Sequence, residues 1–127
     1  MSYKSFSNSF SEIFGTLTRP TEHELEEFWA HIKHNEGQRV VHLIIRYMHE
    51  RRDNYDRWVG VLRSPGVPLA LIFGDVDPVS GKHMSDAFRS ENPNAPVYTF
   101  KDIGHYPQTE APEQVLESYA DFRAGLK

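Results

Sequence analysis

Two short apolar segments in the second half of the chain limit the possible folds more than any other feature of the sequence. The first, residues 69–73 (LALIF), is continuously apolar and ends at Gly74, which is typical of a strand buried on both faces. The second is residues 97–100, and a helix is expected between them at about residues 81–90. This order predicts two parallel strands joined by a right-handed crossover. The fold class is therefore α/β.

The middle of the chain is expected to be helical. Thr21 and Glu24 have the spacing of a capping box, and the apolar residues of about 22–34 recur on one helical face. Residues 40–48 are apolar over a wider arc, which predicts a helix buried on more than one side. A break near Asp53 precedes a short third helix. This pattern is typical of a helical layer that covers another part of a protein.

Three segments follow from these patterns. Residues 1–20 are rich in serine and carry phenylalanines at intervals, and we expect an extended arm whose aromatic side chains dock on other residues. Residues 21–63 form the helical segment, and residues 64–127 form the α/β unit. Two parallel strands alone cannot cover both faces of a sheet or protect its edges. The fold is therefore expected to be incomplete when these residues stand alone.

Composition excludes several classes of function. The 127 residues carry a net charge of −4 and no long basic run, so nucleic acid is not an expected partner. The chain has no cysteine, which rules out disulfides and a thiol nucleophile. No apolar run approaches the roughly 20 residues of a membrane-spanning helix, so no transmembrane segment is expected. A cytoplasmic location is the expectation that follows.

Ionisable side chains follow each of the two expected strands. Asp75 and Asp77 come directly after the first strand, and His105 comes shortly after the second. Parallel strands carry their catalytic groups at their carboxyl ends, so the carboxylates and the imidazole are expected at one rim. There an aspartate can hold a histidine in the tautomer that acts as a general base. The alternative is that the aspartates are turn residues and the histidine is a surface side chain.

These segments resemble the α/β-hydrolase superfamily. The run Gly74 to Asp77 is similar to the family's acid motif, and Gly104, His105, Pro107 and Glu110 are similar to its histidine loop. The stretches FGTLTRPTEHELEEFW, RWVGVL, GDVDPVSG and GHYPQTEAP resemble the mesoderm-specific transcript branch, which is close to epoxide hydrolases and haloalkane dehalogenases. The resemblance implies that Asp77, rather than Asp75, is the acid. It also implies a helical cap at residues 21–63 and the C-terminal part of the catalytic core at residues 64–127.

The sequence departs from this family at one essential point. It has no G-x-S-x-G or G-x-D-x-G elbow to supply the nucleophile, and no oxyanion-hole segment. The isolated chain is therefore expected to be inactive, with Asp77 and His105 serving a nucleophile supplied elsewhere. A serine nucleophile would imply ester or amide substrates, and an aspartate would imply epoxides or haloalkanes. The sequence leaves this choice open, and hydrolysis of this kind requires no cofactor.

Binding residues and partners complete the expectations. Trp29 and Trp58 are the best candidates for a substrate pocket within the helical segment, although for each taken singly a place in the core is the more common role. His31 and His34 share a helix face, but no third ligand completes a recognisable set, so no metal site is expected. Besides a small-molecule substrate, the expected partner is the N-terminal half of a hydrolase or a second copy of this chain. The alternative function is a non-catalytic remnant or interaction module that pairs through its exposed sheet edge.

Overall fold

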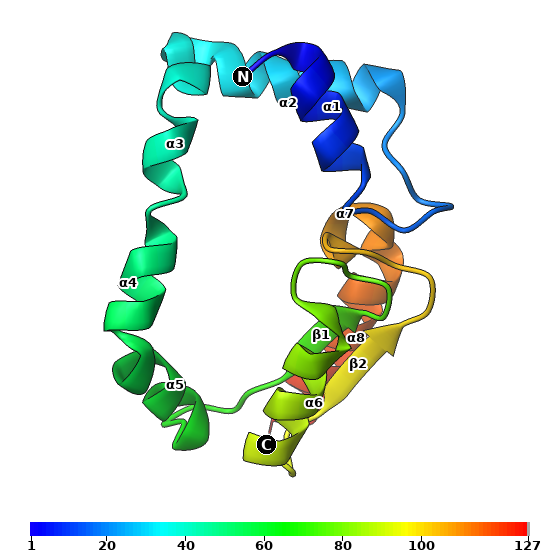
Figure 1. The fold of residues 1–127 in the computed structure, drawn as a ribbon. Coiled ribbons are helices and arrows are strands. Elements are labelled where there is room, and N and C mark those ends of the chain that lie inside the picture. The colour runs from blue at the N-terminus through cyan, green and yellow to red at the C-terminus, as the bar shows by residue number, and fades with distance from the viewer. Residues whose placement is uncertain (127) are drawn as a thin grey trace.

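Figure 1 shows an arc of helices that leads into an α/β unit in the second half of the chain. The computed structural model describes residues 1–126, so Lys127, the last residue of the expected catalytic segment, lies outside the described residues. Within residues 1–126, no helix combines the length and the apolar character needed to cross a lipid bilayer. The elements in chain order are α1 (Tyr3–Ser11), α2 (Glu22–Lys33), the 3₁₀ helix η1 (His34–Arg39), α3 (Val41–Ile44), α4 (Tyr47–Asp53), α5 (Tyr55–Arg63), β1 (Leu71–Gly74), α6 (Gly81–Glu91), β2 (Val97–Phe100), α7 (Pro107–Glu110) and α8 (Pro112–Ala124).

The expectation of an extended arm over residues 1–20 was wrong for its first half. Tyr3–Ser11 form helix α1, whose N-cap Ser2 accepts a hydrogen bond from the amide of Ser5. Phe6 and Phe10 are four residues apart, so they lie on one helical face, where their rings stack with centroids 5.1 Å apart. Phe6 also stacks on Trp29 of α2, with centroids 5.6 Å apart. The helical spacing of these phenylalanines was not recognised in the sequence because serines separate them.

Helix α2 begins where the sequence predicts. Thr21 accepts a hydrogen bond from the amide of Glu24, and the Glu24 carboxylate accepts one from the amide of Thr21, so the predicted capping box is confirmed. The helix ends at Lys33, and Asn35 and Glu36 then adopt positive φ values of 49° and 58°. This turn directs the chain away from α1 and into the arc of α3, α4 and α5, as Figure 1 shows.

The expectation that residues 40–48 are buried on more than one side was wrong. The segment divides into α3 and α4, and Ile44 and Ile45 are 66% and 58% exposed. The break near Asp53 is confirmed, because α4 ends there and α5 starts at Tyr55. Within residues 1–126, no second layer of structure covers α3 and α4, which leaves their apolar side chains in contact with solvent.

The two strands pair in parallel, as predicted. Leu71 lies opposite Val97, and Gly74 lies opposite Phe100. Ile72 and Tyr98 pack against a small core of Phe100, Ile103 and Ala111, to which Val115 of α8 also contributes. Helix α8 therefore covers one face of the sheet, while α6 forms the crossover between the strands. This arrangement brings the carboxyl ends of both strands to the same rim.

Two glycines allow the loops at this rim to lie against each other. A side chain at Gly74 would place its Cβ 2.2 Å from the carbonyl oxygen of Gly104. A Cβ at Gly104 would lie 2.5 Å from the carbonyl oxygen of Ile13 and 2.6 Å from the amide nitrogen of Gly15. All of these neighbours are backbone atoms, which cannot rotate away. Residues 13–15 and the loop after β2 therefore touch only because Gly104 has no side chain.

We expect Gly104→Ala to lower the free energy of unfolding by about 1–3 kcal/mol, because the added methyl group overpacks a backbone contact. The matched control is Gly60→Ala in α5, where a Cβ meets no atom within 4 Å. Alanine is favoured over glycine inside a helix, so this control should raise the free energy of unfolding by up to about 1 kcal/mol. Urea unfolding followed by tryptophan fluorescence measures both, and equal stabilities would contradict the close contact.

Candidate functional site

Asp77 and His105 meet at the carboxyl rim of the sheet, as the sequence predicts. Asp77 follows β1 and His105 follows β2, 28 residues further along the chain. His105 Nδ1 lies 3.0 Å from both carboxylate oxygens of Asp77. The parallel pairing of the strands is what brings these two loops together, and the amide of Val76 donates to the carbonyl of Ile103 between them. The carboxylate and the imidazole therefore form a defined pair.

The surroundings of Asp77 keep its carboxylate ionised. The residue is only 8% exposed, and burial alone would raise the pKa of this carboxyl. Hydrogen bonds from His105 and from the amides of Val79 and Ser80, at 2.7 and 3.2 Å, favour the charged form and hold the pKa of Asp77 below its usual value. At neutral pH the side chain is therefore a buried anion that can only accept hydrogen bonds.

The charge of Asp77 decides the tautomer of His105. An ionised carboxylate has no proton to donate, so the proton of the hydrogen bond belongs to Nδ1 of the imidazole. In the neutral imidazole Nε2 then carries a free lone pair, which is the form required of a general base. The His105 side chain is 26% exposed against 6% for Asp77, so the imidazole is the member of the pair that solvent or a substrate can reach.

Asp75 has a structural role instead. Its carboxylate accepts a hydrogen bond from the amide of Asp102 at 2.7 Å, in the loop after β2. Asp102 has a φ of 62°, a left-handed conformation that non-glycine residues seldom adopt. Asp75 thus stabilises the turn that leads to His105, while Asp77 makes the contact with the imidazole.

Glu110 is a residue of this site that sequence analysis quoted only as part of a motif. Its carboxylate accepts hydrogen bonds from the amides of Gly15, Gly104 and Tyr106, at 2.8, 2.8 and 3.0 Å, and from the hydroxyl of Thr18. Burial raises the pKa of Glu110, but these donors outweigh it and hold the pKa below its usual value. No local pattern could reveal the contact with Gly15, because the two residues are 95 positions apart.

An apolar hollow of about 690 Å³ opens beside the pair. Asp77 and His105 line it together with Trp58, Val59 and other side chains of α5. Leu71 and Phe73 of β1 and Met84 and Phe88 of α6 contribute further apolar walls. The hollow therefore combines one ionised pair with a largely apolar lining, the composition of a small-molecule site.

The two tryptophans named as candidate binding residues have different positions. Trp58 lies in the wall of the hollow that contains Asp77 and His105. Trp29 is not among the residues from 1 to 126 that line this hollow, and its ring packs between Tyr3 and Phe6. The structure thus brings Trp58 to the candidate site and places Trp29 in the contact between α1 and α2.

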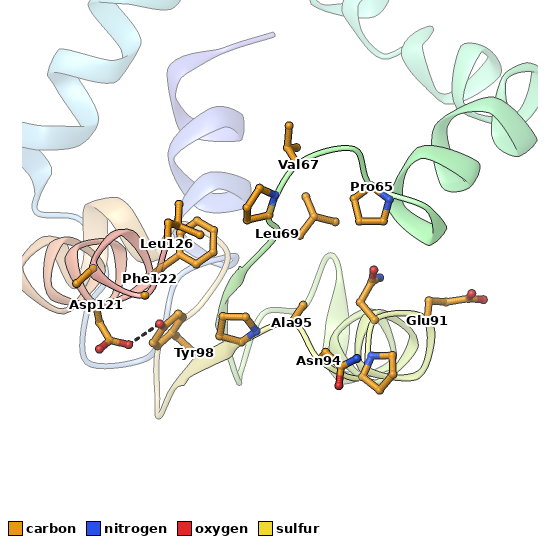
Figure 2. A pocket seen from close by; sticks show the side chains of 16 residues that line it. Pro65, Val67, Leu69, Glu91, Asn94, Ala95, Tyr98, Asp121, Phe122 and Leu126 are labelled. Atoms are coloured by element: carbon orange, nitrogen blue, oxygen red, sulfur yellow. Dashed lines mark hydrogen bonds between the residues drawn. The ribbon is translucent and has the colours of Figure 1, made fainter.

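A second hollow lies at the opposite end of the strands. Figure 2 shows its lining, with prolines before β1 and β2, Leu126 beyond α8, and Tyr98 donating a hydrogen bond to Asp121. Its side chains come from the amino ends of the strands and the carboxyl ends of α6 and α8. In open parallel sheets the reactive groups gather at the other end.

Within residues 1–126 no cluster of three or more metal-ligating side chains is present.

Comparison with known proteins shows which proteins this chain is similar to. The mesoderm-specific transcript protein of Mus musculus is 36% identical over 124 residues, which cover 96% of this chain and 37% of the mouse protein. The putative hydrolase LipZ of Mycobacterium tuberculosis (strain H37Rv) is 34% identical over 113 residues, 89% of this chain and 39% of LipZ. Lipase 3 of Moraxella sp. is 29% identical over 75 residues, 59% of this chain and 24% of the lipase.

The chain has an α/β-hydrolase-like relationship. Its relatives include proteins named as a hydrolase and as lipases, and its own fold of two parallel strands and flanking helices agrees with an α/β class. No protein-family model matches the chain. The chain spans somewhat more than a third of the length of the mouse protein that it matches, at 37%. Sequence similarity and the parallel strand pairing therefore agree at the level of an α/β-hydrolase-like relationship.

The ionised state of Asp77 predicts a pH-dependent stability. Because the pKa of Asp77 is lower in the folded chain than in the unfolded chain, its stabilisation is present above about pH 4 and is lost as the pH falls through the folded-state value. We expect Asp77→Asn to cost about 1–3 kcal/mol of unfolding free energy at pH 7, and the difference should shrink below pH 4.

Urea unfolding at a series of pH values measures this difference. The control is Asp53→Asn, which removes an exposed carboxylate at the end of α4 and should change stability by no more than about 0.5 kcal/mol at any pH. A cost for Asp77→Asn that stayed constant from pH 7 to pH 2.5 would show that the carboxylate is not ionised in the folded chain.

Proposed function

We propose that these residues supply the acid and the general base of an α/β-hydrolase whose nucleophile comes from another polypeptide segment. The observation that carries the proposal is the position of His105 Nδ1, 3.0 Å from both oxygens of an ionised, buried Asp77, beside an apolar hollow. This arrangement leaves Nε2 available to take a proton from a nucleophile or from water.

The reaction follows from the roles of the two side chains. The nucleophile attacks an electrophilic carbon of the substrate while Nε2 of His105 accepts its proton, and Asp77 stabilises the imidazolium that forms. The imidazolium then gives the proton to the leaving group. In the second step Nε2 removes a proton from water as the water oxygen attacks the covalent intermediate, and the imidazolium then returns this proton to the nucleophile as its bond to the product breaks. Each turnover consumes one water and restores the neutral imidazole.

Esters are the substrates that the observations favour. The relatives named as lipases favour ester hydrolysis, and the apolar wall of Trp58, Met84 and Phe88 would accommodate an acyl chain. A serine nucleophile fits this chemistry. An aspartate nucleophile would instead form an alkyl ester with an epoxide or haloalkane, and the same Asp77–His105 pair would then activate water.

The missing groups are proposed to come from polypeptide beyond the 127 residues, whether part of a longer chain or a separate one. The relatives are more than twice as long as the segment they share with this chain. Within residues 1–126, strand β1 pairs with β2 on one side only, so its other edge can accept a further parallel strand. In this proposal residues 21–63 act as the helical cap and residues 64–127 as the C-terminal part of the catalytic core.

An interaction module without catalysis is the second candidate. The observation in its favour is the exposed apolar surface of α3, α4 and the turn between them, including Leu43, Ile44, Ile45 and Met48, together with the edge of β1 that no strand within residues 1–126 pairs with. Such surfaces are typical of protein contacts. In this alternative a second copy of the chain or another protein covers them, and Asp77 and His105 have no reaction to perform.

Complementation tests the enzyme directly. We expect coexpression with the part of LipZ outside the matched region to produce hydrolysis of p-nitrophenyl butyrate that neither polypeptide shows alone. Asp77→Asn should reduce this activity by about 10⁴-fold, and His105→Ala by at least a similar factor, because both remove the general base in its working form. The matched control is His31→Ala, an exposed histidine of α2, which should leave the rate unchanged.

The outcomes separate the two candidates. Activity that survives His105→Ala would contradict the catalytic role of the pair. A stable complex or homodimer with no activity, unaffected by Asp77→Asn, would favour the interaction module. Size-exclusion chromatography with light scattering on the same samples distinguishes a complex from unassociated chains.

A further inference from the structure

Residues 13–18 are attached to the loop that carries His105, although the two lie at opposite ends of the chain. The backbone amide of His105 donates a hydrogen bond to the carbonyl of Ile13 at 2.8 Å. Gly104, immediately before the histidine, lies so close to residues 13–15 that a side chain could not fit there. The peptide backbone at His105 is thus in direct contact with the segment that precedes α2.

Glu110 adds a second and stronger attachment. One of its oxygens, Oε2, accepts from the amide of Gly104 at 2.8 Å, from the amide of Gly15 at 2.8 Å and from the hydroxyl of Thr18. The other oxygen, Oε1, accepts from the amide of Tyr106 at 3.0 Å. A single carboxylate therefore binds the residue before His105, the residue after it and the segment 15–18.

The three consecutive amides around the histidine are all accounted for by these contacts. Those of Gly104 and Tyr106 donate to Glu110, and that of His105 donates to Ile13. Hydrogen bonds to a charged acceptor are about twice as strong as neutral ones, and a carboxylate can accept about four. The carboxylate of Glu110 therefore fixes the amides on both sides of His105, while the carbonyl of Ile13 holds that of His105 itself.

Aromatic packing fixes the same region from the side. The ring of Tyr106 lies 5.5 Å from that of Phe10 and 5.4 Å from that of Phe14, and His105 meets Tyr106 edge to face at 4.8 Å. Helix α1 and its extension therefore contact the residue next to the histidine. The N-terminal segment supports the imidazole through both polar and apolar contacts.

We propose that Glu110 is a positioning residue that holds His105 against Asp77 by fastening both neighbours of the histidine to residues 15–18. This inference rests on the proposed function, because positioning His105 matters only if His105 acts as the general base. Glu110 does not touch the imidazole, so it acts only through the backbone of the loop. Loss of its charge should release the loop, and the hydrogen bond between His105 and Asp77 should weaken although both side chains remain.

The test is Glu110→Gln in the full chain, observed by NMR with ¹⁵N-labelled histidine at pH 7. Glutamine keeps the shape of the side chain, but its NH₂ group faces amides that are themselves donors. In the unaltered chain His105 should show the Nδ1–H tautomer and a slowly exchanging Nδ1 proton. In Glu110→Gln we expect exchange of this proton to accelerate by about tenfold or more, the factor that loss of one charge-assisted hydrogen bond implies.

Two further variants keep the test decisive. Glu113→Gln removes an exposed carboxylate in the first turn of α8 and should leave the His105 signals unchanged. Glu110→Asp retains the charge but shortens the side chain by one carbon, so it should accelerate exchange of the Nδ1 proton less than Glu110→Gln does. It replaces Glu110→Gln in the test if that variant fails to fold. Circular dichroism of each variant reports whether the helices are intact.

The results distinguish the positioning role from the proposed function. Unchanged Nδ1 proton exchange in folded Glu110→Gln or Glu110→Asp would overturn the positioning role and leave the Asp77–His105 pair standing. A His105 without the Nδ1–H tautomer in the unaltered chain would contradict the pair itself, and with it both proposals. If the NMR results are as expected but complementation yields no activity, only the proposed enzymatic function is contradicted, because the NMR measurement needs no nucleophile.

Discussion

The parallel pairing of β1 with β2 is the constraint on which the rest of the site depends. It aligns Gly74 with Phe100, so the loops that follow the two strands leave the sheet side by side. One loop brings a buried carboxylate and the other brings an imidazole, and they meet at 3.0 Å. An antiparallel pair would have placed these loops at opposite ends of the sheet. The chemistry of the site is thus a consequence of strand direction.

Local sequence signals predicted the features that depend on neighbouring residues. The capping box at Thr21, the strand at residues 97–100 and the meeting of Asp77 with His105 all rest on short patterns or on the known geometry of parallel strands. The features that sequence analysis missed depend on residues far apart in the chain or on a helical pattern that the surrounding serines obscure. Helix α1 was hidden among serines, and the contact of Glu110 with Gly15 joins positions that no periodicity relates.

The helical arc presents the opposite case, in which a strong sequence signal led to the wrong degree of burial. Residues 40–48 have the apolar content of a buried helix, yet their side chains face solvent in the described chain. The apolar sequence of residues 40–48 suits a buried helix, but no other part of the described chain covers α3 and α4. An apolar surface of this kind costs free energy in water, and burial of it would release that cost.

The contact between residues 13–18 and the histidine loop also has a consequence for folding. It joins positions up to 95 residues apart in a chain of 127, so most of the chain lies between the two contacting segments. Contacts of such long range carry a loop-closure entropy that must be paid before they stabilise the fold, so they are slow to form. Strand pairing can precede this closure, but the backbone of His105 gains its last hydrogen-bond partners only when the two ends of the molecule meet. A partly folded chain would accordingly carry the histidine without the geometry of a base.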